Sequence, residues 1–312
     1  MTAAGPVESG DRVLPGEALG SLPLPAGVDP LVLELEVGRI TALRSRPLDA
    51  GGHPVVSRGT ALLVPGFTGS KEDHRLLLPL LAAHGWDAWA FSQRGQADSA
   101  APEGAGDYRL EDFADDTLEI AALLASLGDG SPVHLLGHSF GGVIARAAAI
   151  AGPDNFASLT MLCSGPHGWP DRKTDVRTRL LAADGTDLWR LDNPELADLP
   201  DGELSENDRF LRERSGRTSV DHLLGAISIL ADPRDSTEAL AETGLPVLVA
   251  HGEEDAAWPQ VWQASMARRL DALYEVIPDA GHLPNVENPS RTVEVLHSFW
   301  SAVSGSSART AT

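Results

Sequence analysis

Cysteine is almost absent from this chain of 312 residues, in which Cys163 stands alone. A single cysteine excludes an intrachain disulfide, and nothing in the sequence points to an oxidising compartment. Cys163 closes the apolar run Leu159-Thr160-Met161-Leu162, and a cysteine in such a position usually packs as a small hydrophobic side chain. We therefore expect a buried thiol and not a nucleophile, because no neighbouring residue would lower its pKa.

Positive charge is also scarce. The chain has 24 lysines and arginines against 45 aspartates and glutamates, a formal net charge of −21. Phosphate recognition needs clustered Lys and Arg, so this balance argues against nucleic acid or an anionic membrane as a partner. No apolar run approaches the roughly 18 residues of a membrane span, and residues 1–12 lack the apolar core of a signal peptide. We expect no membrane span and a cytoplasmic protein.

Cofactor motifs are missing as well. No group of His, Cys and acidic residues has the spacing of metal ligands, so the sequence predicts no metal site. The loop Gly66-Phe67-Thr68-Gly69-Ser70 lacks the lysine of a phosphate-binding loop. We therefore expect no metal and no cofactor.

Strands and helices alternate along most of the chain. A hairpin of half-exposed edge strands is predicted at 31–37 and 40–43. The continuous apolar run at 60–64 predicts a strand buried on both faces, and further strands are predicted at 86–91, 132–136, 157–163, 246–250 and 273–277. Helical patterns separate them, at 71–84, 110–127, 143–150, 259–270 and 289–303. This alternation indicates βαβ units, hence an α/β fold with a mostly parallel twisted sheet and helices on both faces.

The alternation stops over residues 165–242. This stretch carries helical patterns at 174–183, 204–215, 219–231 and 236–242, and it has no strand signal. We interpret it as a helical insertion that covers the carboxyl edge of the sheet as a cap or lid. The α/β core then comprises residues 31–164 and 243–303. It is flanked by an N-terminal arm at 1–30, extended or flexible, and by a C-terminal tail at 304–312.

A glycine-rich turn, Gly137-His138-Ser139-Phe140-Gly141-Gly142, joins one buried strand to its helix. A serine in G-x-S-x-G between strand and helix sits on a sharp turn that lifts its hydroxyl above the sheet. The glycines allow a strained backbone and close packing of strand and helix. The pentapeptide alone could be a plain connecting turn, but both flanks are present, so Ser139 is the candidate nucleophile.

A serine nucleophile needs a base that is held by a carboxylate. Of the ten histidines, His282 lies off regular structure, in a turn-rich loop after the last strand, and we expect it to be the base. Asp255 follows the strand at 246–250 and is the preferred acid. Glu254 and Asp171 are the alternatives. Backbone N–H groups of Phe67 and Phe140 are the candidate oxyanion hole.

In this order, Pro65-Gly-Phe-Thr-Gly-Ser70, Gln93-Arg-Gly-Gln96, the turn at 137–142, Asp255 and Gly281-His282 resemble the α/β-hydrolase fold superfamily. The resemblance covers about residues 31–303. It implies an α/β-hydrolase fold and a serine hydrolase, esterase- or thioesterase-like, with a Ser-Asp-His triad. Two positions depart from many relatives: Pro65 stands in place of a histidine, and Ser92 in place of an aspartate. Relatives such as haloalkane dehalogenases use aspartate at the elbow, so Ser139 argues against their activities.

The leading function is hydrolysis of a carboxylic ester, thioester or lactone of a small-molecule acyl substrate through an acyl-enzyme. Hydrolysis of a carbon–carbon bond and perhydrolysis without a cofactor are alternatives on the same triad. A non-catalytic binding or sensing protein is a third, whose mark would be a broken triad. The insertion offers apolar residues either to an acyl chain or to its own core: Trp169, Trp189, Leu223, Ile227 and Leu230. No signal indicates an oligomeric state.

Overall fold

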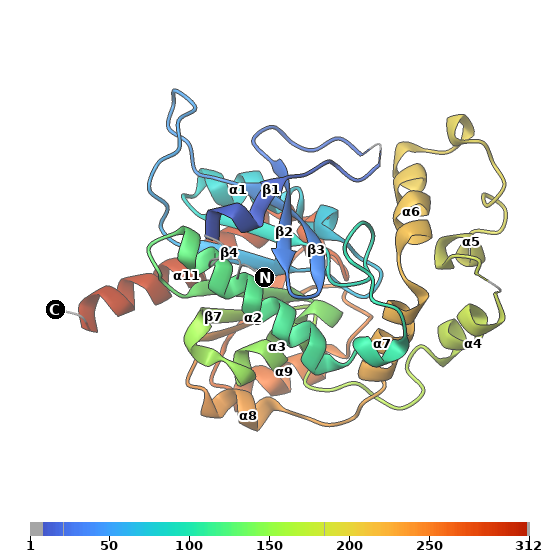
Figure 1. Cartoon of the computed structure of the whole chain (residues 1–312). Coiled ribbons are helices and arrows are strands. Elements are labelled where there is room, and N and C mark those ends of the chain that lie inside the picture. The colour runs from blue at the N-terminus through green and yellow to red at the C-terminus, as the bar shows by residue number, and fades with distance from the viewer. Residues whose placement is uncertain (1–8, 21, 184, 311–312) are drawn as a thin grey trace, which may run out of the picture.

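A nine-stranded sheet forms the centre of the computed structural model, which describes residues 9–20, 22–183 and 185–310 (Figure 1). Its strands lie in the order β1-β2-β3-β5-β4-β6-β7-β8-β9. Their bounds are β1 (Val13–Pro15), β2 (Asp29–Leu35), β3 (Gly38–Ser45), β4 (Thr60–Val64), β5 (Asp87–Phe91), β6 (Val133–His138), β7 (Phe156–Leu162), β8 (Val247–Gly252) and β9 (Leu273–Ile277).

The sheet is antiparallel at one end and parallel over the rest. β1, β2 and β3 pair antiparallel, and β3 joins the edge of the parallel strands through β5. From β5 to β9 every pairing is parallel. All residues of β6 and of β8 are buried, as expected for parallel strands covered on both faces. The predicted α/β fold is confirmed.

Alternate residues of each central strand enter two separate cores. Leu62 and Val64 pack with α2 (Leu110–Leu127), α3 (Phe140–Ala151) and α9 (Gln260–Arg269). Ala61 and Leu63 pack on the other face with α1 (Leu77–Ala83) and α11 (Pro289–Thr310). The short helical elements are α10 (Pro284–Glu287) and the 3₁₀ turns η1 (Ser9–Arg12), η2 (Lys71–His74), η3 (Ala105–Asp107), η4 (Pro153–Asn155) and η5 (Asp201–Glu203). Among the described helices, none has the length and apolar character needed to cross a bilayer.

The stretch between β7 and β8 is helical. It contains α4 (Thr174–Ala182), α5 (Leu188–Asp192), α6 (Glu206–Arg217), α7 (Val220–Leu230) and α8 (Thr237–Glu242). Four of these helices match predicted segments, whereas the short α5 was not predicted. In Figure 1, α4, α5 and α6 stand to one side of the sheet, and α8 lies near α9. We call residues 165–242 the insertion.

The structure differs from the sequence prediction at four places. The hairpin predicted at the edge lies inside the sheet, because β1 pairs with β2 and β5 pairs with β3. The described part of the arm is tied down, because β1 pairs with β2 and Leu19 packs in a buried cluster with Phe210 of α6. The predicted tail from residue 304 is helical, since α11 continues to Thr310 and no proline interrupts it. The helix predicted at 71–84 is split into η2 and α1. Pro79 accounts for the split, because a proline fits only the first turn of a helix. Residues 1–8 and 311–312 lie outside the described chain.

Candidate active site

Ser139 sits on a strained turn between β6 and α3. Its backbone has φ 55° and ψ −117°, a conformation that side-chain-bearing residues rarely adopt and that the surrounding structure must impose. The Ser139 N–H donates to the carbonyl of Leu162 at 2.8 Å, which fastens the turn to β7. The nucleophile candidate is thus held by backbone contacts at the carboxyl edge of the sheet.

Two glycines of the turn leave no room for a side chain. A Cβ at Gly137 would lie 2.3 Å from the Gly141 carbonyl oxygen. A Cβ at Gly141 would lie 2.4 Å from the carbonyl oxygen of Val64 at the end of β4. Both distances are shorter than any contact a Cβ makes, so the glycines of the motif are required by packing.

The structure brings the three predicted side chains together. Nε2 of His282 lies 2.9 Å from Oγ of Ser139, and its Nδ1 lies 2.9 Å from Oδ1 of Asp255. Asp255 is 4% exposed and also accepts hydrogen bonds from the Ala257 N–H at 3.0 Å and from Gln263 at 2.9 Å. Burial alone would raise the pKa of Asp255, but the hydrogen bond and charge of His282 and the other donors outweigh it, so the pKa lies below its usual value. The carboxylate is ionised at neutral pH and can orient the imidazole.

The two alternative acids lie elsewhere. Glu254 and Asp171 are both exposed, and within the described chain neither carboxylate forms an ion pair with His282, as Asp255 does. Asp171 has φ 65° and joins α4 through a turn. Asp255 is therefore the carboxylate that the fold aims at the histidine.

Sequence reasoning missed the residues that support the acid and the histidine loop. Gln263 of α9 is fully buried and donates to Oδ2 of Asp255. The carboxylate of Glu287, on α10, accepts a hydrogen bond from the N–H of Gly281.

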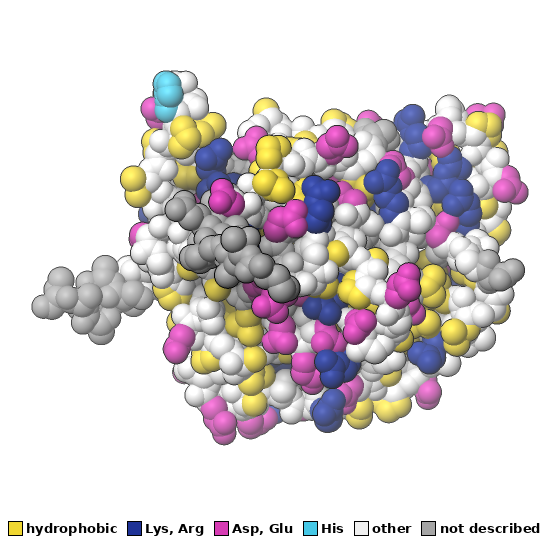
Figure 2. Space-filling view, in the orientation of Figure 1, with side chains coloured by type: hydrophobic (Ala, Val, Ile, Leu, Met, Phe, Trp, Pro, Cys, Tyr) yellow, Lys and Arg dark blue, Asp and Glu magenta, His cyan; other side chains and the backbone are white. Residues whose placement is uncertain are grey.

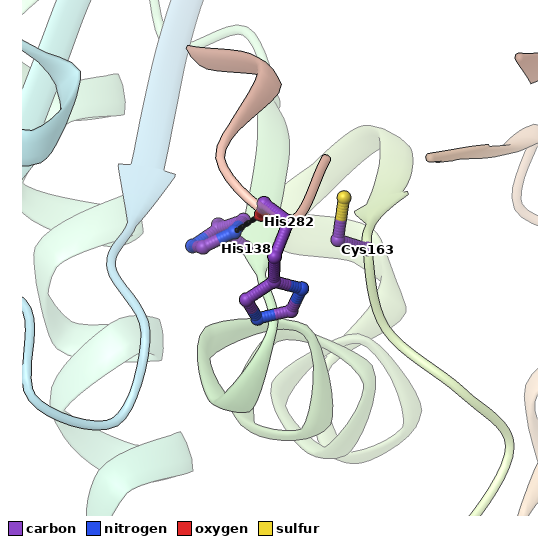
Figure 3. Close-up of side chains that lie close together, drawn as sticks. All are labelled: His138, Cys163 and His282. Carbon is purple, nitrogen blue, oxygen red and sulfur yellow. Dashed lines mark hydrogen bonds between the residues drawn. The ribbon is translucent and has the colours of Figure 1, made fainter. Parts of the chain in front are cut away.

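His138 also holds the histidine loop, because its Nε2 donates a hydrogen bond to the carbonyl of His282 at 2.7 Å (Figure 3). Burial, with a smaller contribution from His282, lowers the pKa of His138 to about 3, so this ring is neutral. The contact between His138 and His282 joins segments 144 residues apart, and no motif marks any of the three contacts.

His138, Cys163 and His282 form a cluster whose ring nitrogens and sulfur lie within 4.8 Å of one another (Figure 3). Its donors suit a metal poorly. Nε2 of His138 is used by a carbonyl, and burial and nearby Asp255 raise the pKa of the Cys163 thiol well above its usual value, whereas metals bind the thiolate. His282 is already shared between Ser139 and Asp255. We assign no metal to this cluster.

The loop after β4 faces the serine and is held by two glutamines. Gln93 donates to the carbonyl of Pro65 and Gln96 to that of Gly66, each at 2.7 Å. In a trans peptide the N–H points opposite to the carbonyl, so the bond from Gln96 turns the Phe67 N–H the other way. A Cβ on Gly66 would lie 3.5 Å from Cβ of Ser139, which places the loop against the nucleophile.

The second predicted donor is the N–H of Phe140. Phe140 is the first residue of α3, and the first N–H groups of a helix have no partner within it. The positive end of the helix dipole adds to the attraction for a developing oxyanion. Both predicted backbone donors thus belong to segments that border Ser139.

The insertion contributes a histidine that the sequence analysis did not select. Nε2 of His222, on α7, lies 3.3 Å from the Phe67 carbonyl. Burial lowers the pKa of His222 to about 4, so the ring is neutral. A Cβ on Gly95 would lie 2.6 Å from Cβ of His222. Gly95, in the Gln93–Gln96 motif, therefore lets His222 approach this loop. This glycine is the feature of the sequence from which the contact could have been predicted.

The apolar residues predicted to face an acyl chain fall into two groups. Leu223 and Ile227 belong to a cluster of the insertion that packs against Phe67, with Val176, Leu180 and Leu188. Trp189 and Leu223 border a cavity of about 180 Å³ that also touches Thr68. Trp169 packs instead against Trp258 and Trp262, and Leu230 is buried in the core of the sheet.

Comparison with known proteins decides the family. A model of the alpha/beta hydrolase family matches residues 61–295. The chain belongs to this family. The predicted resemblance is confirmed, and with it the α/β-hydrolase fold.

Several relatives in this family are similar over most of the chain. The RutD protein of Pantoea ananatis, which bears the name of a carbamate hydrolase, is 32% identical over 76% of this chain and 86% of its own length. A pimeloyl-[acyl-carrier protein] methyl ester esterase of Methylococcus capsulatus is 31% identical over 60% of this chain and 78% of its own. The solved structure of a thermophilic esterase from Thermogutta terrifontis has a TM-score of 0.68, with 23% identity over 88% of this chain and 99% of that one. The chain is an enzyme of the α/β-hydrolase type.

Proposed function

We propose that this α/β-hydrolase cleaves carboxylic esters through an acyl-enzyme on Ser139. The observation that carries the proposal is the unbroken pair of 2.9 Å contacts from Ser139 through His282 to Asp255. This arrangement supplies a nucleophile, a base and a group that stabilises the protonated base. Relatives named as methyl ester esterases support an ester as the substrate.

In the first half-reaction, Nε2 of His282 takes the proton of Ser139 as Oγ attacks the ester carbonyl carbon. The negative charge on the carbonyl oxygen is held by the N–H groups of Phe67 and Phe140. Asp255 stabilises the imidazolium. His282 then donates the proton to the departing alcohol oxygen, and the C–O bond of the ester breaks, which leaves an acyl group on Ser139.

In the second half-reaction, water replaces the alcohol. His282 takes a proton from the water as its oxygen attacks the acyl carbonyl, and returns it to Oγ of Ser139 as the acid leaves. Thioesters and lactones follow the same steps, so they belong to the proposed substrate class of small acyl compounds. The insertion serves in this proposal as a lid, because its cluster around Leu223 and Ile227 packs on Phe67.

Carbamates are the second candidate, favoured by the 32% identity to the RutD protein. The chemistry at Ser139 would be the same up to the covalent intermediate. A carbamoyl group loses its carbonyl reactivity to nitrogen donation, so its release from the serine is slower than that of an acyl group. The two functions therefore differ in which half-reaction limits turnover.

The experiment combines trapping with turnover. Wild-type enzyme is mixed with p-nitrophenyl butyrate or with p-nitrophenyl N-methylcarbamate, and intact-protein and peptide mass spectra are recorded with time. We expect the adduct on Ser139 in both cases, rapid release of butyrate and slow release of the carbamate. Cys163→Ala is the matched control for the nearby thiol and should give the same adducts. An adduct on another residue, or turnover of butyrate with no dependence on Ser139, contradicts the proposal.

A further inference from the structure

A cavity of about 780 Å³ lies on the far side of α7 from Phe67. It is bounded by α2, α3, α7 and the segment around His167. Its apolar surface comes mainly from Val143, Ala147 and Ile150 of α3 and from Leu224 and Ile229 of α7. Ser139, Asp255 and His282 are not among the described residues that line it. A volume of this size is typical of a small-molecule site.

The helix α7 separates this cavity from the candidate active site. Leu224 and Ser228 line the cavity, whereas Leu223 and Ile227 on the same helix belong to the cluster that packs on Phe67. Each pair is spaced by four residues, and the helical repeat places the two pairs on different faces. The cavity is thus a compartment of its own and shares one wall with the active site.

Arg146 of α3 is the charged group deepest in the cavity wall. It is 4% exposed, and its Nη1 donates to the Gly165 carbonyl at 2.9 Å. Among the residues that the structure describes, no carboxylate lies within ion-pair distance of it. Burial lowers the pKa of Arg146 to about 10, although the negative charge of Asp235 acts in the opposite direction and raises it. Asp235 itself forms an ion pair with Arg269. A buried guanidinium without a counter-ion is costly, and an anion in the cavity would relieve that cost.

Charges at the mouth of the cavity are exposed and of both signs. Arg109 pairs with Asp112 and Arg234 with Asp232. Glu111, Asp115 and Arg177 are exposed at the rim. In Figure 2, acidic and basic side chains stand close together on the lower part of the face, where Figure 1 shows α2 beside α7. Exposed charges are screened by water and salt, whereas the buried Arg146 is not. Its positive charge therefore favours a negatively charged ligand in the cavity.

We propose that this cavity binds an aliphatic carboxylate. The carboxylate pairs with the free N–H groups of Arg146, a geometry in which a guanidinium can donate two parallel hydrogen bonds. The alkyl chain lies on the apolar side chains of α3 and α7 and is removed from water there. The proposal concerns binding alone and stands whether or not Ser139 hydrolyses esters.

The test measures binding of octanoate to the full chain by isothermal titration calorimetry, with octan-1-ol as a neutral probe of the same length. We expect saturable binding of one octanoate per chain and at least tenfold weaker binding of octan-1-ol. Arg146→Gln should weaken octanoate at least tenfold and leave octan-1-ol nearly unchanged. Arg179→Gln removes one positive charge on the exposed face of α4 and is the matched control, which should bind octanoate as the wild type does.

A second pair of variants locates the site independently of Arg146. Ala147→Trp and Ile150→Trp place a large ring into the cavity from half-buried positions, and each should abolish octanoate binding with a melting temperature close to that of the wild type. These variants decide the question if Arg146→Gln does not fold. Absence of saturable binding, equal affinity for both probes, or binding that survives both tryptophan variants would overturn the proposal.

Discussion

Two parts of the chain meet at Ser139, and they hold their residues in different ways. Ser139 directly follows β6, Asp255 comes three residues after β8 and His282 comes five residues after β9, so the sheet itself brings the three side chains together. The insertion contacts the Phe67 loop through His222 of α7, and its helix α6 is joined to η2 by Arg214, which pairs with Asp73 at 2.6 Å. We infer that the sheet carries the chemistry, while the insertion positions the loop at Phe67 and affects the choice of substrate. Substitutions in the two parts should then fail differently.

The largest effect is expected from Ser139→Ala. Removing the nucleophile of a triad costs roughly 10⁶ in kcat, with residual catalysis from the oxyanion donors and from binding. The measurement is the rate of p-nitrophenyl butyrate hydrolysis, with fluorophosphonate labelling in parallel. Cys163→Ser is the control and should retain most activity, because that thiol is buried and protonated. An alanine variant that keeps its full rate would remove Ser139 from the proposed mechanism.

The next effect is expected from Asp255→Asn. The amide keeps the shape but loses the charge that orients His282 and stabilises its protonated form. In the Ser-His-Asp triad of serine proteases, the same substitution lowers kcat by about 10⁴. Glu254→Gln and Asp171→Asn are the matched controls, and each should cost less than about tenfold because both side chains are exposed. A large loss in Asp171→Asn with a mild loss in Asp255→Asn would transfer the role of the acid to the insertion.

The same contrast explains what could be predicted from the sequence. Apolar runs identify the central strands, because strands buried on both faces have little choice of residue. Ser139, Asp255 and His282 were selected from loops at strand ends, and in the structure they lie within hydrogen-bonding distance. These residues could be found from local sequence because the loops that follow parallel strands all lie at the same edge of the sheet.

Contacts between distant segments carry no such local mark. The bond from His222 to Phe67 spans 155 residues of sequence, and neither helical periodicity nor composition indicates which face of α7 turns toward the loop. The same holds for β1, whose pairing with β2 rests on the path of the arm. Trp169 is a second example. An apolar residue in the insertion predicts burial, but it does not predict that this half-buried ring packs against Trp258 of the sheet core.

Ile227→Ala tests the insertion directly. It shortens a buried side chain in the cluster that packs on Phe67, and even one missing methylene in an apolar pocket changes discrimination between substrates by about 1–3 kcal/mol. We expect the preference for octanoyl over acetyl p-nitrophenyl ester to change about tenfold, while the rate on the acetate ester changes little.

Val295→Ala on α11 is the matched control for Ile227→Ala, because it also truncates a buried aliphatic residue but in the core on the other face of the sheet. It should lower stability without altering the ratio of acyl-chain preferences. Equal loss on every ester in the Ile227 variant would mean that the cluster serves only to hold the fold.

The smallest effect on rate, and the most specific one on stability, is expected from His222→Gln. Burial lowers the pKa of His222 to about 4, whereas an unfolded histidine titrates near about 6.5. Between these values the unfolded chain binds the extra proton and the folded chain does not, so the free energy of unfolding falls as the pH drops from about 6.5 to about 4.

The glutamine of this variant is neutral and can still donate a hydrogen bond to the Phe67 carbonyl, but it does not titrate. In urea melts, the variant should therefore lose up to about 1.4 kcal/mol per pH unit of that slope. His53→Gln is the matched control, because it makes the same replacement at an exposed position. Since the bond to Phe67 is retained, the rate on butyrate should fall less than tenfold. His222→Ala removes the donor and should lower kcat further than glutamine does. An alanine variant as active as the glutamine variant would show that the insertion fills space above Phe67 without positioning it.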